Sequence, residues 1–135
     1  MQVCVTFRQG DVVPEELLLG NTPETEFGLT TGAHHTVYAV SVWRHVVHYL
    51  LLNQRSGPRP DWYPAYLFEI TNPKLPWGWS MVRAGADVGL PVELLFGYEE
   101  LAQADGRHYI DLIERVPEAL AVFERRREMI DTTDD

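Results

Sequence analysis

The stretch from Asp61 to Trp79, DWYPAYLFEITNPKLPWGW, constrains the fold more than any other part of the chain. It holds three of the four tryptophans and is interrupted by prolines. Within it, Tyr66–Ile70 is aromatic, apolar and β-branched, with one charge at Glu69, which predicts a strand. Asn72-Pro73 ends this strand, because proline cannot join a hydrogen-bonded ladder and asparagine favours a turn. Trp79–Arg83 predicts the next strand.

The aromatic residues of this stretch have two interpretations. Large aromatics supply much of the buried area of a small β domain, which favours packing in the core. Alternatively, Trp62, Tyr63 and Trp77 lie outside the predicted strands and form an exposed, ligand-binding face. The sequence alone leaves both interpretations open.

Alternating or continuous apolar runs predict further strands in the first 97 residues. His35–Trp43 and Val46–Leu52 are apolar on both faces, and only Arg44-His45 lies between them, which is the spacing of a β-hairpin. Val92–Phe96 suits either a strand or a helix, and the flanking proline and glycine favour a strand. The weaker predictions are strands at Gln2–Arg8 and Phe27–Thr31 and one helical turn at Pro14–Leu19.

The C-terminal third has helical periodicity. Tyr98–Ala104 and His108–Arg115 predict two short helices, and Pro117 begins a last helix whose apolar stripe leaves Arg125–Arg127 on the solvent side. Residues 132–135 are expected to be frayed. Strands first and helices last predict an α+β domain spanning 1–135, with a strand-rich part (1–97) and a helical part (98–131). The strands, about five or six and antiparallel, predict a small barrel or a strongly bent sheet.

Charge is distributed unevenly along the chain, whose formal net charge is −9. Acidity of this size disfavours nucleic-acid binding, which needs a basic face, and it favours a basic protein partner. The alternative is that acidic loops only keep the domain in solution. Two stretches, Gln9–Trp43 and Ala84–Gly106, hold ten of the twenty acidic residues and no lysine or arginine: Asp11, Glu15, Glu16, Glu24, Glu26, Asp87, Glu93, Glu99, Glu100 and Asp105.

Cysteine usage and hydropathy indicate the compartment. Cys4 is the single cysteine and lies in an apolar run, which predicts a buried, inert thiol and no internal disulfide. The sequence shows no signal-peptide pattern and no apolar run of about 18 residues, so a cytoplasmic location without membrane contact is expected. No glycine-rich nucleotide-binding loop occurs, and no cofactor is expected.

The titratable residues offer little for catalysis or metal binding. The five histidines (His34, His35, His45, His48 and His108) do not converge in an extended chain, because neighbouring strand residues point to opposite faces, so no metal site is expected. An acid in apolar surroundings can act as a general acid or base, and Glu69 is the one candidate. No GxSxG motif for a serine nucleophile occurs.

Several motifs together resemble a family. The runs LTTGAHHTVYAVSVW (Leu29–Trp43), WYPAYLFEI, LPWGW and GYEELA, with a closing helix that contains Phe123, resemble small bacterial proteins similar to immunity proteins of polymorphic-toxin systems. The resemblance covers about two thirds of the chain, and Ala33–His35 departs from the usual single aromatic after Gly32. It implies an SH3-like barrel followed by C-terminal helices, and it implies no catalytic residues.

The sequence therefore predicts a non-catalytic binding protein, an immunity-like inhibitor that covers the active-site rim of a basic toxin or enzyme. One alternative is an SH3-like module that binds a peptide or small ligand in an aromatic groove. A second alternative is a small enzyme that uses Glu69. The expected partner-binding residues are the acids and the aromatic anchors: Glu15, Glu16, Glu24, Glu26, Trp62, Tyr63, Trp77, Asp87, Glu93, Glu99, Glu100 and Asp105.

Overall fold

The computed structural model describes residues 1–7, 13, 14, 17, 19, 28–53, 59–85 and 89–133. Of the helical turn expected at Pro14–Leu19, residues 14, 17 and 19 are described, and the N–H of Leu17 donates to the carbonyl of Pro14 at 2.9 Å; the other three residues lie outside the described ranges. The elements in chain order are β1 (Gln2–Val5), β2 (His34–Thr36), β3 (Ala39–Trp43), β4 (Val46–Leu52), β5 (Pro60–Pro64), the 3₁₀ helix η2 (Ala65–Leu67), β6 (Phe68–Asn72), β7 (Ser80–Arg83), β8 (Leu94–Gly97), α2 (Arg107–Ile113) and α3 (Pro117–Thr133).

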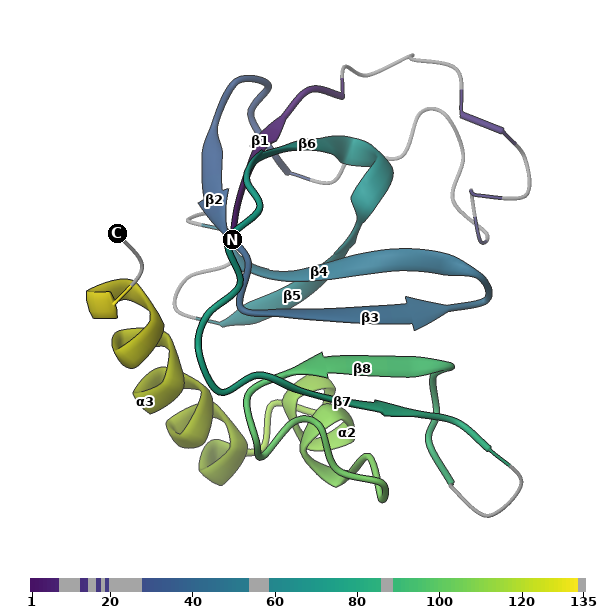
Figure 1. Cartoon of the computed structure of the whole chain (residues 1–135). Helices are drawn as coiled ribbons and strands as arrows, with labels where there is room; N and C mark the ends of the chain where they lie inside the picture. Colours follow the sequence, from purple (N-terminus) through teal and green to yellow (C-terminus); the bar gives the residue numbers. More distant parts are fainter. Residues whose placement is uncertain are drawn as a thin grey trace.

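The strands form two antiparallel sheets, neither of which closes on itself (Figure 1). One sheet has the order β2-β1-β6, and the other has the order β5-β4-β3-β8-β7. The predicted α+β class, with antiparallel strands followed by helices, is confirmed. The described residues contain eight strands, which is more than the five or six expected, because the predicted strand His35–Trp43 is divided into β2 and β3 and because β5 was not predicted.

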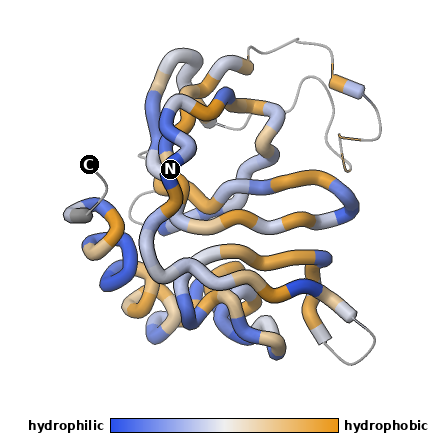
Figure 2. The backbone as a smooth tube through the Cα atoms, viewed as in Figure 1, coloured by the Kyte–Doolittle hydropathy of each residue, from blue (hydrophilic) through white to orange (hydrophobic). Residues whose placement is uncertain are grey.

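Alternation along β4 explains how the three layers enclose two hydrophobic clusters, one on each face of the five-stranded sheet. Tyr49 and Leu51 point into a cluster with residues of β1, while Leu50, between them, points into a cluster with both helices. The five-stranded sheet is therefore covered by the three-stranded sheet on one face and by α2 and α3 on the other. This double burial explains why apolar residues occupy both faces of Val46–Leu52, with His48 as its one polar residue, and Figure 2 shows the hydrophobic colour along these inner strands.

The hairpin between β3 and β4 has the predicted two-residue turn. Trp43 pairs with Val46, and Arg44 and His45 have φ angles of 50° and 68°. Both central residues of a type I′ turn need positive φ, which usually selects asparagine or glycine. The backbone N–H of His45 donates to the Glu93 carboxylate at 3.0 Å, which helps to hold this turn.

The prediction of one strand over His35–Trp43 is wrong, because the chain changes sheet in the middle of it. The N–H of Val37 donates to Met1 in the three-stranded sheet, and the N–H of Tyr38 donates to Leu50 in the five-stranded sheet, each at 2.9 Å. β2 and β3 therefore belong to different sheets. Periodicity does not reveal this change, since both layers bury apolar side chains.

Two other predicted strands also differ from the structure. The strand expected at Tyr66–Ile70 begins two residues later, because η2 precedes it and buries Leu67, whose carbonyl accepts the N–H groups of Thr6 and Phe7. Gly28–Thr31, expected to be part of a strand, is not in one. Gly28 has φ of 70°, and the chain turns at Thr30–Ala33 through a 3.0 Å hydrogen bond.

The prediction of a helix at Tyr98–Ala104 is also wrong. The segment makes consecutive turns instead, with the carbonyl of Tyr98 accepting N–H groups from Leu101 and Ala102. Gly106 then takes φ of 62° and lies so close to Pro91 that a Cβ atom would be 2.8 Å from its ring. The left-handed glycine redirects the chain into α2 and sets where that helix begins.

Helix α3 is held against the five-stranded sheet by one aromatic contact and a polar clamp. Phe123 is 1% exposed and packs edge-on against Tyr38, with ring centroids 5.5 Å apart. The Tyr38 hydroxyl donates to Asp131 at 2.8 Å, and Arg127 pairs with both Asp131 and Glu124. The α3 helix continues to Thr133, beyond its expected end. Among the described residues, no helix has the length and hydropathy needed to cross a membrane.

Truncating this aromatic contact is expected to destabilise the fold strongly. Phe123→Ala leaves a cavity between α3 and the sheet, and we expect the free energy of unfolding to fall by about 3–5 kcal/mol in urea titrations followed by circular dichroism. Arg125→Ala, on the exposed side of the same helix, is expected to change it by less than about 0.5 kcal/mol. Equal losses in the two variants would show that α3 is not docked through Phe123.

Candidate functional site

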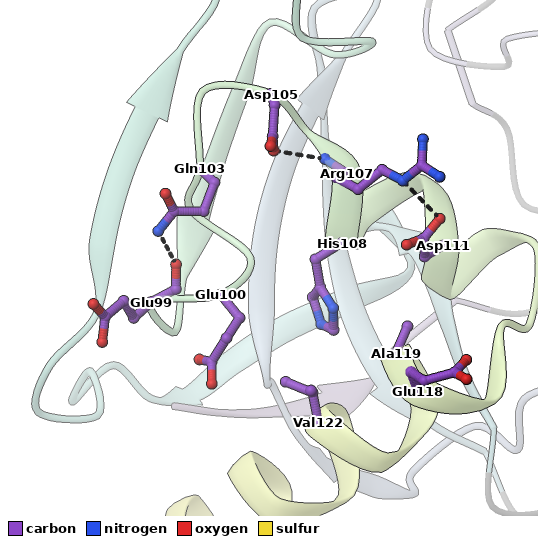
Figure 3. A pocket seen from close by; sticks show the side chains of 10 residues that line it. All are labelled: Glu99, Glu100, Gln103, Asp105, Arg107, His108, Asp111, Glu118, Ala119 and Val122. Carbon is purple, nitrogen blue, oxygen red and sulfur yellow. Dashed lines mark hydrogen bonds and ion pairs between the residues drawn. The ribbon is translucent and has the colours of Figure 1, made fainter.

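An open hollow lies between the turns that follow β8, the start of α2 and the first turns of α3 (Figure 3). Its volume is about 510 Å³. Five carboxylates line it, together with one arginine and one histidine, and we call it the acidic hollow. Its lining residues are Glu99, Glu100, Gln103, Asp105, Arg107, His108, Asp111, Glu118, Ala119 and Val122.

Local hydrogen bonds hold the turns that form one wall of the acidic hollow. The Gln103 side chain donates to the carbonyl of Glu99 at 2.6 Å. The Asp105 carboxylate accepts the N–H of Arg107 at 3.0 Å, which satisfies a free donor at the start of α2. Figure 3 shows both contacts, with the ion pair of Arg107 and Asp111 on the first turn of that helix. The acidic residues thus lie on turns whose backbone is held by hydrogen bonds from nearby side chains.

Arg126 of α3 joins the helix to this wall. Its guanidinium lies 2.8 Å from the Glu100 carboxylate and 3.9 Å from that of Glu99. Partial burial opposes ionisation of Glu100, but the hydrogen bond and charge of Arg126 outweigh it and lower the pKa of this carboxyl. The sequence pattern placed Arg126 on the solvent side of the last helix; the structure turns it toward the acidic hollow instead.

His108 is half-buried in the lining of the acidic hollow and packs against Tyr98. Burial raises the pKa of Tyr98 and lowers that of His108, although Glu100 and Asp111 act in the opposite direction on the histidine. Both groups are therefore neutral near pH 7, and we assign the Tyr98 hydroxyl as donor to Nε2 of His108, 2.6 Å away. This pair is a structural support for the wall.

A second hollow, of about 270 Å³, lies beside the first and is largely aromatic and apolar. We call it the Trp77 groove. Gly78, with φ of 88°, turns the chain so that Trp77 is 100% exposed, while Trp79 packs edge-on against Phe96. Glu99 lines both hollows, so the two form one continuous surface. The lining residues of the Trp77 groove are Pro76, Trp77, Gly78, Trp79, Tyr98, Glu99, Arg126, Met129 and Ile130.

The structure brings together four of the predicted partner-binding residues. Trp77, Glu99, Glu100 and Asp105 all line this continuous surface. Glu93 lies elsewhere, beside His45 in the hairpin turn. The remaining predicted acids fall outside the described residues: Glu15, Glu16, Glu24, Glu26 and Asp87.

Two of the predicted aromatic anchors are not where the sequence placed them. Trp62 and Tyr63 lie within β5, not outside the strands. Tyr63 is buried, and Trp62 packs against Tyr109 of α2 with ring centroids 5.5 Å apart. For these two residues the core interpretation is correct, and Trp77 alone of the three is fully exposed.

The described residues support neither a catalytic role for Glu69 nor a metal site at the histidines. Glu69 is exposed on β6, at one end of the three-stranded sheet, and so lacks the apolar surroundings that its proposed role required. His48 is buried with Nδ1 3.0 Å from the carbonyl of Val46. Within the described ranges, no three histidine, cysteine, aspartate or glutamate side chains are grouped so that they could hold a metal ion.

Sequence reasoning missed the contribution of the helices to the site. Five lining residues were not predicted as site residues: Asp111 of α2, Glu118, Arg126 and Met129 of α3, and Gln103 of the turns before α2. The sequence feature that could have indicated this is in the last helix, where apolar and charged residues occur together outside the buried stripe. Such a helix face is hard to distinguish from ordinary solvent exposure without knowing what packs beside it.

Comparisons with protein-family models, with curated proteins and with solved structures found no match. The resemblance to immunity proteins therefore stays a prediction. The chemistry of the Trp77 groove and the acidic hollow is the remaining basis for a function.

One buried and two half-buried histidines make stability depend on pH. Burial lowers the pKa of His35, His48 and His108, so the unfolded chain binds protons near pH 6.5 while the folded chain does not. We expect the free energy of unfolding to decrease as the pH falls through this range, in urea titrations at a series of pH values.

His108→Gln removes one of these groups and should reduce the pH slope by up to about one proton. His45→Asn is the control, because its side chain is 93% exposed and asparagine tolerates the positive φ of the turn. An unchanged slope in the His108 variant would contradict a neutral, half-buried His108 in the folded chain.

Proposed function

We propose that this chain is a non-catalytic, cytoplasmic binding protein that inhibits a basic toxin or enzyme by covering its surface. One observation carries the proposal: a fully exposed tryptophan, Trp77, lies on the same surface as five carboxylates. Tryptophan at the centre of a contact and charges around it are the usual arrangement of energetic hot spots.

The two hollows would make different contributions to binding. Desolvating the indole of Trp77 supplies non-polar contact area, which exposed charges cannot supply. Glu99, Asp105 and Glu118 would attract a basic partner over a distance and orient it before contact. Inhibition would then follow from occlusion of the partner's active-site rim and would need no chemistry from this chain.

The finer parts of the sequence prediction are part of this proposal. We propose that the two sheets are an opened form of an SH3-like barrel. The change of sheet at Val37 and Tyr38 supports this, because one nearly continuous extended segment crosses from the three-stranded to the five-stranded sheet. The immunity-like role is supported by the resemblance of sequence motifs and by the acidity of the described surface.

A second candidate function is recognition of a peptide or small ligand in the Trp77 groove. The volume of about 270 Å³ and the apolar walls favour it. It differs from the first function in its dependence on salt, because contacts with an apolar groove are screened little by ions. The five carboxylates on the adjoining surface have no part in this alternative, which is why we place it second.

Capture of proteins from a lysate of the native cells tests the first function. We expect a basic protein to be retained at low salt and lost at high salt, since the Debye length shrinks from about 30 Å at 0.01 M to about 3 Å at 1 M. Purified with this chain, the captured protein should lose its own activity.

Matched charge reversals sharpen the test. Glu99→Lys should weaken retention at least about tenfold, because like charges in contact cost several kcal/mol. Glu69→Lys makes the same change on the other sheet and should have little effect. Equal retention by the two variants, or no basic protein at any salt concentration, would contradict the proposed function.

A further inference from the structure

The Trp77 groove combines an aromatic face and a carboxylate in a way that selects one kind of side chain. The indole of Trp77 is 100% exposed, and the side chain of Glu99, on the same groove, is 78% exposed. We propose that the groove receives an arginine side chain of the partner protein, with its guanidinium over the indole of Trp77 and paired with Glu99. This inference rests on the proposed function and names what the partner must present.

The same chain already contains the expected packing. Arg44 lies over the ring of Trp43 in the hairpin turn, with its guanidinium carbon 4.8 Å from the ring centroid. Such contacts are attractive because the face of an indole carries negative charge. Trp77 offers an equivalent face, and in this case the guanidinium would come from another molecule.

Arg126 neutralises part of the negative charge beside the Trp77 groove. Its guanidinium is hydrogen-bonded to Glu100 at 2.8 Å, whereas its distance to Glu99 is 3.9 Å, too long for a hydrogen bond. Two carboxylates therefore stand beside one guanidinium, and Glu99 keeps the capacity to accept from a second one. Arg126 also forms part of the groove wall, and its positive charge would repel a cationic side chain, so we expect a partner arginine to enter from the Trp77 side.

The shape and chemistry of the groove favour arginine over lysine. A guanidinium is planar, stacks on aromatic rings, pairs with a carboxylate through two parallel hydrogen bonds and is weakly hydrated. A lysine ammonium is compact and strongly hydrated, and it pairs as a point charge. The apolar wall formed by Pro76, Met129 and Ile130 would cover the aliphatic stem of the arginine.

The neighbouring acidic hollow indicates that the arginine belongs to a polypeptide, not to a small cation. A chain that places one arginine in the Trp77 groove would extend past Glu99 toward the carboxylates of Asp105, Asp111 and Glu118. Charge complementarity therefore commits the surface to a basic segment with several positive side chains. A single small cation in the Trp77 groove would contact Glu99 and leave the acidic hollow beside it without a ligand.

Nuclear magnetic resonance with defined peptides tests the inference without knowledge of the partner. The probe is a capped peptide of alternating glycine and arginine, with lysine and citrulline counterparts of the same length. The indole N–H signal of Trp77 is assigned with a Trp77→Phe variant. We expect saturable shifts of this signal with the arginine peptide, binding at least about threefold weaker with lysine, and no binding with citrulline, which lacks the charge.

Variants at exposed positions keep the fold and locate the site. Trp77→Leu and Glu99→Gln should each weaken binding of the arginine peptide at least about fivefold. Trp43→Leu and Glu69→Gln remove the same side-chain types elsewhere and should leave binding unchanged. Equal binding of arginine and lysine peptides, shifts centred on Trp43, or no saturable binding would overturn the inference.

The outcomes also separate this inference from the proposed function. Salt-sensitive capture of a basic protein that is unaffected by Trp77→Leu would overturn the arginine site and leave the proposed function standing. An arginine peptide that binds at Trp77, while no basic protein is captured at any salt concentration, would support the site and overturn the proposed function.

Discussion

The packing of Phe123 against Tyr38 is the contact on which the binding surface depends. It fixes α3 on the face of the five-stranded sheet. Because α3 supplies Arg126 to the turns after β8 and one wall to each hollow, neither hollow exists without it. Near the end of the helix, Asp131 accepts a hydrogen bond from the Tyr38 hydroxyl and pairs with Arg127, which ties this part of α3 to the same tyrosine. Burial of one ring thus determines where the charges of the site are placed.

Much of the fold could be predicted from local pattern. The apolar residues on both faces of Val46–Leu52 and the two-residue separation of this segment from Trp43 correctly indicated a doubly covered hairpin. The change of sheet at Val37 and Tyr38 could not be predicted, because both layers bury apolar residues with the same alternation. The turns at Tyr98–Gly106 could not be distinguished from a helix, since their apolar residues happen to be spaced by three and four.

The candidate site was predictable in part. The exposure of Trp77 and the grouping of Glu99, Glu100 and Asp105 follow from short-range sequence, because glycine turns and acidic loops favour the surface. Trp62 was misplaced because an aromatic residue between two prolines gives no sign that β5 pairs with β4 and meets α2. The role of Arg126 depends on which turn packs beside α3, and this is a property of the tertiary structure alone.

Hydrogen–deuterium exchange on the complex with a captured partner tests the central claim most directly. If the partner docks on the surface that α3 completes, amide protection will increase in residues 76–79 and 98–103, at the Trp77 groove and the acidic hollow. Protection confined to β1, β2 and β6 of the three-stranded sheet would contradict the account, because those strands contribute no residue to either hollow.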